Sequence, residues 1–242
     1  MIYTRIQTKA FQTLILICLL VSVSAIVCAQ RSPQPETRTP RALGNGRGAL
    51  WLDLPQPIDT GAKYLFYLHG RIIEEEGVNA VSQVFGAYEY EQILQTFVDK
   101  GFVVISEPRP KGTDVQQYAT KVVGQINTLV QAGVPPQKIT VVGASKGGSI
   151  AVAISSQLRN RNINFALVAA CGNSDMYGNV LSVWDYLDDT GAAMCGKYFA
   201  GAKGLNRHKE VELRIGLGHG ILYRPLSEWV DLVVEWTNQP AH

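Results

Sequence analysis

The chain has 242 residues, of which 46% are hydrophobic and 17% charged, and these proportions are typical of a globular protein rather than a disordered or fibrous one. This length fits one sizeable domain with a substantial core. The formal net charge of +2 comes from Arg5 and Lys9, and the rest of the chain is balanced. The composition therefore gives no reason to expect nucleic acid or an anionic membrane surface as a partner.

The first 29 residues have the pattern of a signal peptide. Arg5 and Lys9 precede a nearly continuous apolar run over residues 11–27, and small residues follow in Val27-Cys28-Ala29. We predict cleavage after this tripeptide, a mature chain that begins at Gln30, and export to the periplasm or the exterior without stable membrane insertion. Two alternatives are an uncleaved membrane anchor, for which the run is short, and lipidation at Cys28, whose preceding residues match poorly.

The mature chain divides into a flexible leader over residues 30–48, rich in Pro, Arg, Thr and Gly, and one domain over residues 49–242. Apolar runs predict strands at residues 49–54, 63–68, 102–106, 139–142, 165–170, 180–184 and 211–217. Helical spacing predicts helices at residues 90–99, 150–158 and 226–236, and another that begins near Thr113 or Asp114 and ends before Gly133. Alternating strands and amphipathic helices predict a three-layer α/β/α sandwich around a mostly parallel sheet.

A strand-to-helix junction contains the sequence Gly143-Ala144-Ser145-Lys146-Gly147. The G-x-S-x-G pattern between a strand and a helix is the nucleophile elbow of serine hydrolases. Gly143 and Gly147 have no Cβ, so the chain can pass close to other backbone at this sharp turn. We therefore predict that Ser145 is a nucleophile that projects above the edge of the sheet.

A serine nucleophile needs a base, and the histidine expected in that role follows a later strand. His219 lies between two glycines after the last predicted strand and before the last helix. His208 stands in a polar run, which favours a solvated surface position, and His242 is the last residue. The sequence therefore predicts His219 as the base.

The acid that orients the base is expected in the loop before that strand, where three aspartates stand close together. We favour Asp188, because its distance from the strand end leaves room for the loop to turn back toward the histidine. Asp189 is the second choice and Asp185 the third. The alternative is that two of these residues cap a helix beginning near Thr190.

An oxyanion hole needs two backbone N–H donors. One is expected from Lys146, the residue after the serine, and the other from Arg71, with Ile72 as the alternative. Arg71 follows His69-Gly70 at the end of a predicted strand. We expect His69 to support this loop through hydrogen bonds rather than to take part in the chemistry.

Taken together, these motifs resemble the α/β-hydrolase family. The resemblance covers about Tyr64 to Trp236 and rests on Leu68-His69-Gly70, the elbow at residues 143–147, an Asp-rich loop and Gly218-His219-Gly220. It implies a Ser-His-Asp triad and an acyl-enzyme mechanism without a metal or an organic cofactor. The substrate it implies is a small molecule with a carboxylic ester or a related acyl bond.

The sequence departs from the family pattern in two places. The gap between Ala170 and Val180 leaves little room for an inserted cap, and the first strands of the family's sheet are hard to find. The alternatives to ester hydrolysis are acyl transfer or peptide cleavage with the same triad, and a hydrolase-like domain that binds a ligand without catalysis.

Export would leave the mature chain with two cysteines, Cys171 and Cys195, since Cys18 and Cys28 belong to the signal. Two cysteines in an oxidising compartment predict one disulfide, and the alternative is a pair of buried thiols.

Several charged side chains near these motifs have less definite roles. We expect Glu74-Glu75-Glu76 to form a solvated acidic face and Arg109 either to position a substrate or to pair with Asp114. The Lys146 side chain either adds positive charge near the site or points to solvent. The aromatic residues over residues 85–90 are expected in the core.

Overall fold

A computed structural model describes residues 48–172, 175–190 and 193–239. The predicted signal peptide and nearly all of the predicted leader lie outside these ranges. Contacts divide the chain into two units, and every described residue belongs to the second, whereas the first, Met1–Arg38, falls outside the described ranges. No helix among the described residues is long and apolar enough to cross a membrane.

The centre of the fold is a seven-stranded sheet with the order β1-β5-β2-β6-β7-β8-β9. Its strands are β1 (Ala49–Trp51), β5 (Phe102–Ile105), β2 (Lys63–Leu68), β6 (Ile139–Ala144), β7 (Asn164–Val168), β8 (Tyr177–Asp185) and β9 (Gly204–Leu213). Every neighbouring pair of these strands is parallel, so their carboxyl ends lie along one edge. The predicted elbow, His69 and the Asp-rich loop all follow strands that end at this edge.

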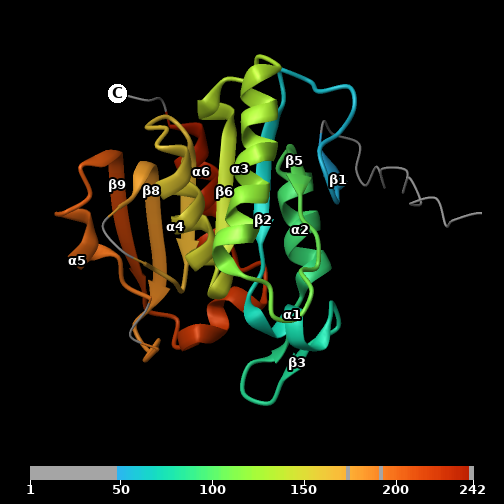
Figure 1. Cartoon of the computed structure of the whole chain (residues 1–242). Coiled ribbons are helices and arrows are strands. Elements are labelled where there is room, and N and C mark those ends of the chain that lie inside the picture. Colours follow the sequence, from blue (N-terminus) through green and yellow to red (C-terminus); the bar gives the residue numbers. More distant parts are fainter. Residues whose placement is uncertain (1–47, 173–174, 191–192, 240–242) are drawn as a thin grey trace, which may run out of the picture. The chain divides into compact units, whose positions relative to one another are not determined.

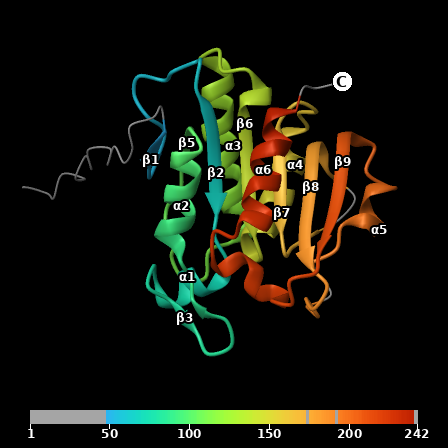
Figure 2. The same cartoon turned by 180° about the vertical axis from the view of Figure 1, so that it is seen from behind.

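Helices cover both faces of the sheet, which confirms the predicted three-layer α/β/α sandwich of the α/β-hydrolase fold. Figure 1 shows α3 (Val115–Gln131) and α4 (Lys146–Leu158) on one face, and Figure 2 shows α2 (Tyr90–Asp99) and α6 (Ser227–Asn238) on the other. The side chains of β2 alternate between the two layers. Tyr64 and Phe66 join the core beneath α3 and α4, whereas Leu65 and Tyr67 join the core beneath α2 and α6.

The return from β7 to β8 is short. Residues 169–176 join two parallel strands that are usually connected through a helix, and this length leaves no room for a cap. The first residue of β8 contacts α4, where the Ser155 hydroxyl donates to the Tyr177 carbonyl oxygen at 2.7 Å and accepts from its N–H at 2.7 Å.

A small hairpin lies between β2 and α2, where the sequence predicted no strand. After α1 (Arg71–Glu76), β3 (Val81–Ser82) pairs antiparallel with β4 (Gly86–Ala87). Both strands have only two residues, too few for a period-2 pattern to be visible. In Figure 1 this hairpin lies at the end of the sheet where the carboxyl ends of the strands meet.

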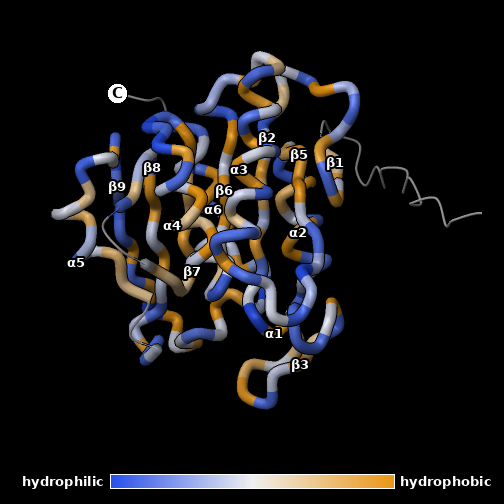
Figure 3. The backbone as a smooth tube through the Cα atoms, in the orientation of Figure 1, coloured by the Kyte–Doolittle hydropathy of each residue, from blue (hydrophilic) through white to orange (hydrophobic). Residues whose placement is uncertain are grey.

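The last strand lies earlier in the chain than predicted. The apolar run predicted a strand over residues 211–217, but β9 begins at Gly204 and ends at Leu213. Its middle is polar because β9 is an edge strand with exposed side chains, and Figure 3 shows it largely hydrophilic. The remaining elements are η1 (Pro136–Lys138), α5 (Gly196–Phe199) and η2 (Gly218–Tyr223).

Candidate active site

Ser145 lies on a strained turn between β6 and α4. Its φ of 51° and ψ of −118° place a residue with a side chain in a region that usually favours glycine. The Gly148 N–H donates to the Ser145 carbonyl oxygen at 2.8 Å, so the helix begins directly after the turn. The backbone of Ser145 therefore has neither strand nor helix geometry, and its side chain leaves the chain in a direction that neither element allows.

The flanking glycines permit close backbone contact. A Cβ on Gly143 would lie 2.5 Å from the Gly147 carbonyl oxygen, and a Cβ on Gly147 would overlap the Leu68 carbonyl oxygen. A third glycine, Gly148, is equally constrained, because its Cβ would overlap that of Ala170. The elbow therefore packs directly against the ends of β2 and β7, and any side chain at these positions would push Ser145 away.

His219 lies between Ser145 and Asp188. Its Nε2 is 3.0 Å from the Ser145 Oγ, and its Nδ1 is 2.8 Å from the Asp188 Oδ2. The His219 side chain is 20% exposed, whereas that of Asp188 is fully buried. The structure thus brings together the three residues that the sequence singled out as nucleophile, base and acid.

The three neighbouring aspartates have different environments. Asp188 accepts from the Thr190 hydroxyl at 2.7 Å and from its N–H at 3.1 Å. Burial by itself raises the pKa of Asp188, but the hydrogen bonds from His219 and Thr190 outweigh it and lower the pKa below the usual value. Asp189 is exposed. Among the described residues the first helix after Thr190 is α5, which begins at Gly196, so the alternative that two aspartates cap a helix near Thr190 has no support there.

Asp185 organises the loop that carries the histidine. It accepts from the N–H groups of Ile215 and Gly216 through Oδ2, at 3.0 and 3.1 Å, and from Gly218 through Oδ1 at 2.8 Å. A fourth bond comes from the Leu187 N–H at 3.2 Å. Burial raises the pKa of Asp185, and these four donors lower it further than burial raises it. Asp185 therefore joins the turn after β8 to the loop after β9.

Arg71 and Lys146 begin the two helices that adjoin the serine. As the first residues of α1 and α4, their N–H groups have no acceptor within their own helices. A Cβ on Gly70 would lie 3.7 Å from the Ser145 Cβ, so the start of α1 is close to Ser145. The two residues therefore adjoin Ser145, Ile72 follows one position further into α1, and the role of these N–H groups as oxyanion donors stays a prediction.

His69 is buried and neutral. The Arg109 N–H donates to its Nε2 at 2.9 Å, which leaves Nδ1 to donate to the Gly70 carbonyl oxygen at 2.8 Å. Burial and the neighbouring Arg109 guanidinium lower the pKa of His69 to about 3. This histidine supports the loop and makes no hydrogen bond to Ser145 in the described structure.

Three charged side chains meet behind the elbow. Glu74 is buried and contacts both Arg109 and Lys146, while Glu75 and Glu76 are exposed. The expected solvated face is therefore wrong for Glu74, because only this member of the run turns inward on α1. Asp114 caps α3 instead of pairing with Arg109, as it accepts from the Gln116 and Gln117 N–H groups.

Sequence reasoning gave Glu74 no role, because nothing in a run of three glutamates marks the buried one.

A cavity of about 310 Å³ opens beside Ser145. It is lined by Arg71, Val115, Ser145, Lys146, Ser149, Ala169, Ala170, Cys171, Thr190 and His219. A second cavity of about 350 Å³ lies on the other side of the histidine loop, where Phe85 and Leu217 contribute apolar walls. The Phe85 ring centre lies 6.5 Å from that of His219. The first cavity therefore reaches His219 itself, and the second adjoins the loop that carries it.

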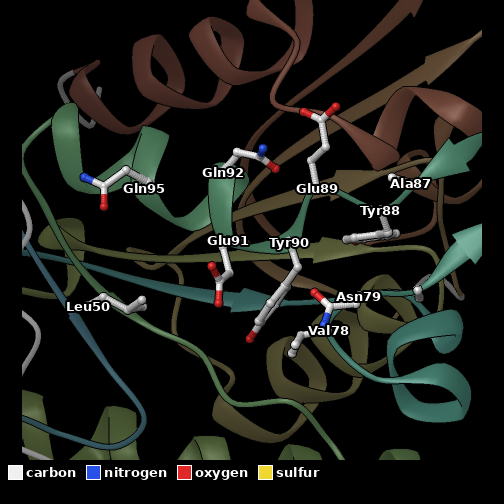
Figure 4. Close-up of a pocket in the computed structure, with 11 residues that line it drawn as sticks. Leu50, Val78, Asn79, Ala87, Tyr88, Glu89, Tyr90, Glu91, Gln92 and Gln95 are labelled. Carbon is white, nitrogen blue, oxygen red and sulfur yellow. The ribbon is translucent and has the colours of Figure 1, made fainter.

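The largest cavity described, about 690 Å³, is a different one. Figure 4 shows its lining, which includes Tyr88, Tyr90 and Glu91, and none of Ser145, His219 and Asp188 contributes to it. Tyr88 and Tyr90 are buried, as expected for core aromatics, and the Tyr88 hydroxyl lies 2.7 Å from that of Tyr67.

Cys171 and Cys195 form a disulfide, with their Cα atoms 5.3 Å apart. Cys171 follows β7 and lines the cavity beside Ser145, and Cys195 precedes α5. The bridge thus closes the stretch of chain that contains Asp188. Within the described residues, no group of three or more His, Cys, Asp or Glu side chains is arranged to hold a metal ion.

Comparison with known proteins finds similarity only among solved structures. No family model and no curated protein matches the chain. The chain is similar to Arabidopsis thaliana SOBER1, with 13% identity, a TM-score of 0.48, and coverage of 73% of this chain and 97% of that one. It is also similar to MGS-M1, an α/β hydrolase from a deep-sea metagenome of the Medee basin, with 13% identity, a TM-score of 0.49, and coverage of 77% of this chain and 88% of that one.

A lipase-esterase related protein from Clostridium acetobutylicum is 12% identical, with a TM-score of 0.47 and coverage of 74% of this chain and 96% of that one. Similarity at this level does not bear on the substrate or on the role of any residue.

Proposed function

We propose that this protein is a serine hydrolase that cleaves a carboxylic ester or a related acyl bond. The observation that carries the proposal is the hydrogen-bonded series from Ser145 through His219 to Asp188, with distances of 3.0 and 2.8 Å. A serine in hydrogen-bond contact with an imidazole, whose other nitrogen contacts a buried carboxylate, is the arrangement that activates a hydroxyl for attack.

In the first step, the Ser145 Oγ attacks the acyl carbon while the His219 Nε2 takes its proton. The Asp188 carboxylate accepts from Nδ1–H and stabilises the positive charge that develops on the imidazole. The bond to the alcohol then breaks, and His219 gives the proton to the departing oxygen. Water repeats these steps on the acyl-enzyme, which releases the acid and regenerates Ser145.

The negative charge on the tetrahedral intermediate needs donors, and we assign them to the backbone N–H groups of Arg71 and Lys146. Both are the first residues of helices, where unpaired N–H groups and the helix dipole favour a negative charge. Loss of a single donor of this kind costs roughly 100- to 1,000-fold in kcat.

We also propose that the protein works after export. The N-terminal sequence has the signal pattern, and a disulfide persists best in an oxidising compartment. Expression of the full chain, followed by N-terminal sequencing of the exported protein, tests this. A mature chain beginning at Gln30 is expected, and an intact N-terminus found only in the cytosol would contradict it.

An alkyl fluorophosphonate probe tests the activity directly. Wild type should be labelled at Ser145 and should hydrolyse p-nitrophenyl esters of graded acyl length, and Ser145→Ala should do neither. Ser149→Ala is the matched control, because Ser149 lines the same cavity but contacts neither His219 nor Asp188 in the described structure. A folded wild-type protein that is neither labelled nor active on any ester would refute the proposal.

A further inference from the structure

A buried carboxylate shared by two cations lies behind the nucleophile elbow. Glu74 Oε1 is 2.9 Å from the Arg109 Nε, and Glu74 Oε2 is 2.5 Å from the Lys146 Nζ. The side chains of Glu74, Arg109 and Lys146 are 1%, 0% and 15% exposed. We call these three residues the ion cluster.

Stability alone is a weak reason for such a cluster. Removing charges from water costs several kcal/mol per ion, and apolar side chains of similar size often serve a core at least as well. The Arg109 Nη1 also has no hydrogen-bond partner among the described residues, although the guanidinium carbon lies 5.4 Å from the Tyr118 ring centre. The ion cluster is therefore better explained by something that it holds in place.

The ion cluster connects α1 and α4, the two helices that begin beside Ser145. Glu74 lies in the first turn of α1, three residues after Arg71, and Lys146 is the first residue of α4, directly after Ser145. The Glu74–Lys146 ion pair thus joins the first turns of the two helices whose N–H groups we assign to the oxyanion hole.

Two further bonds anchor the ion cluster. Lys146 Nζ donates to the Thr113 carbonyl oxygen at 2.8 Å, which fixes it to the loop before α3. The Arg109 Nη2 donates to the His69 carbonyl oxygen, and the Arg109 N–H donates to the His69 ring. The segment from His69 to Arg71 is therefore held at two places. Arg109 holds His69, and the ion pair between Glu74 and Lys146 holds α1, which begins at Arg71.

We propose that the side chains of Glu74 and Lys146 are positioning residues that set the distance and direction between the two oxyanion donors. Neither side chain touches the reacting atoms. Their ion pair fixes α1 relative to the elbow, so that the Arg71 and Lys146 N–H groups converge on the same oxygen. This inference rests on the proposed function, because it assigns a role within that same site.

Lys146→Met is the first variant, because Lys146 is the partly exposed end of the cluster and its loss leaves Glu74 paired with Arg109. A displaced donor costs up to about 100-fold, so kcat on p-nitrophenyl acetate should fall 10- to 100-fold with little change in KM. A trifluoromethyl ketone forms an oxyanion on the serine, and its Ki should weaken by a similar factor. Lys146→Arg should recover part of both.

Glu74→Gln completes a double-mutant cycle. If the ion pair is the acting unit, the double variant should lose no more activity than Lys146→Met alone. Glu75→Gln is the matched control, because Glu75 is the exposed neighbour on α1 and should retain wild-type kcat and Ki. Should Glu74→Gln fail to fold, Lys146→Met and Lys146→Arg still decide the question.

Labelling and melting temperature separate the possible failures. A folded Lys146→Met protein that is labelled at Ser145 and keeps the wild-type kcat and ketone Ki would overturn the inference while leaving the proposed function intact. A decrease in melting temperature without change in these two quantities would also overturn it, because the cluster would then be structural only. An unlabelled, inactive wild type would remove the proposed function, and this inference with it.

Discussion

The two walls of the candidate site are held by different interactions. The wall formed by α1 is fixed by charged side chains that meet from distant parts of the chain, Glu74, Arg109 and Lys146. The wall formed by the loops after β8 and β9 is fixed by one carboxylate, Asp185, that accepts four backbone N–H groups. The two ion pairs of the first wall join side chain to side chain, whereas the four hydrogen bonds of Asp185 in the second wall join a side chain to the backbone.

This difference predicts how each wall responds to substitution. A backbone N–H group cannot be removed by substitution, so loss of the Asp185 carboxylate leaves one buried and three partly buried donors without their acceptor. Side-chain pairs can instead be removed together. The variants below test this contrast, beginning with the residue that the second wall presents to the histidine.

Asp188→Asn should have the largest effect on activity. An amide in place of the carboxylate cannot stabilise the protonated imidazole and favours the wrong tautomer of His219, which costs about 10,000-fold in kcat in enzymes with this arrangement. Steady-state kinetics with a p-nitrophenyl ester measure it. Asp189→Asn is the matched control, and an equal loss in both variants would contradict the assignment of the acid.

Asp185→Ala should have the largest effect on stability. Four N–H donors lose a carboxylate acceptor, the Gly218 N–H buried and the other three partly buried, and since a hydrogen bond to a charged group contributes roughly 1.5–3 kcal/mol when buried and less when water can replace it, the free energy of unfolding should fall by about 4 kcal/mol. Urea denaturation measures it. Asp189→Ala, on the exposed neighbour, should change stability by less than about 0.5 kcal/mol. Similar losses in the two variants would mean that Asp185 does not hold this wall.

Removal of the disulfide should destabilise the second wall by a somewhat smaller amount. Cys171 and Cys195 are 24 residues apart, and a closed loop of this length stabilises a fold by about 3.5 kcal/mol in the chain-entropy description. The Cys171→Ala/Cys195→Ala variant should therefore melt at a lower temperature. Reduced wild type should match it, and a reductant should have no effect on the double variant itself.

His69 should make the first wall sensitive to acid. The pKa of His69 is about 3 in the folded protein and about 6.5 in the unfolded chain. Below pH 6.5 the unfolded state therefore binds a proton that the folded state does not, and the free energy of unfolding decreases as the pH is lowered. Between pH 7 and pH 5 this amounts to about 2 kcal/mol. Denaturation of His69→Gln should show a flatter pH dependence over this range. His208→Gln, at an exposed histidine, should keep the wild-type slope.

Much of the fold could be predicted from the sequence, because the signals for it are local. Strands buried on both faces appear as continuous apolar runs, and the elbow appears as glycines at fixed distances from Ser145, since a Cβ cannot fit there. The order of the serine, the Asp-rich loop and His219 along the chain pointed to the three segments that the structure brings into hydrogen-bond contact.

Features at the edges of the fold could not be predicted in this way. The polar middle of β9 carries no apolar pattern because its side chains are exposed, and the two-residue strands of the β3–β4 hairpin are too short for any periodicity.

Only the tertiary structure distinguished residues of one type in one neighbourhood. Asp185, Asp188 and Asp189 are nearly equivalent in sequence, yet one accepts backbone N–H groups, one contacts His219 and one is exposed. In the same way, Glu74 turns inward while its two neighbours face solvent. Composition and spacing report local conformation, whereas the partner of a charged side chain depends on which distant segment packs against it. The sequence by itself therefore determined the layered fold and the position of Ser145 at the turn from strand to helix, and long-range packing decided the partners of the charged side chains.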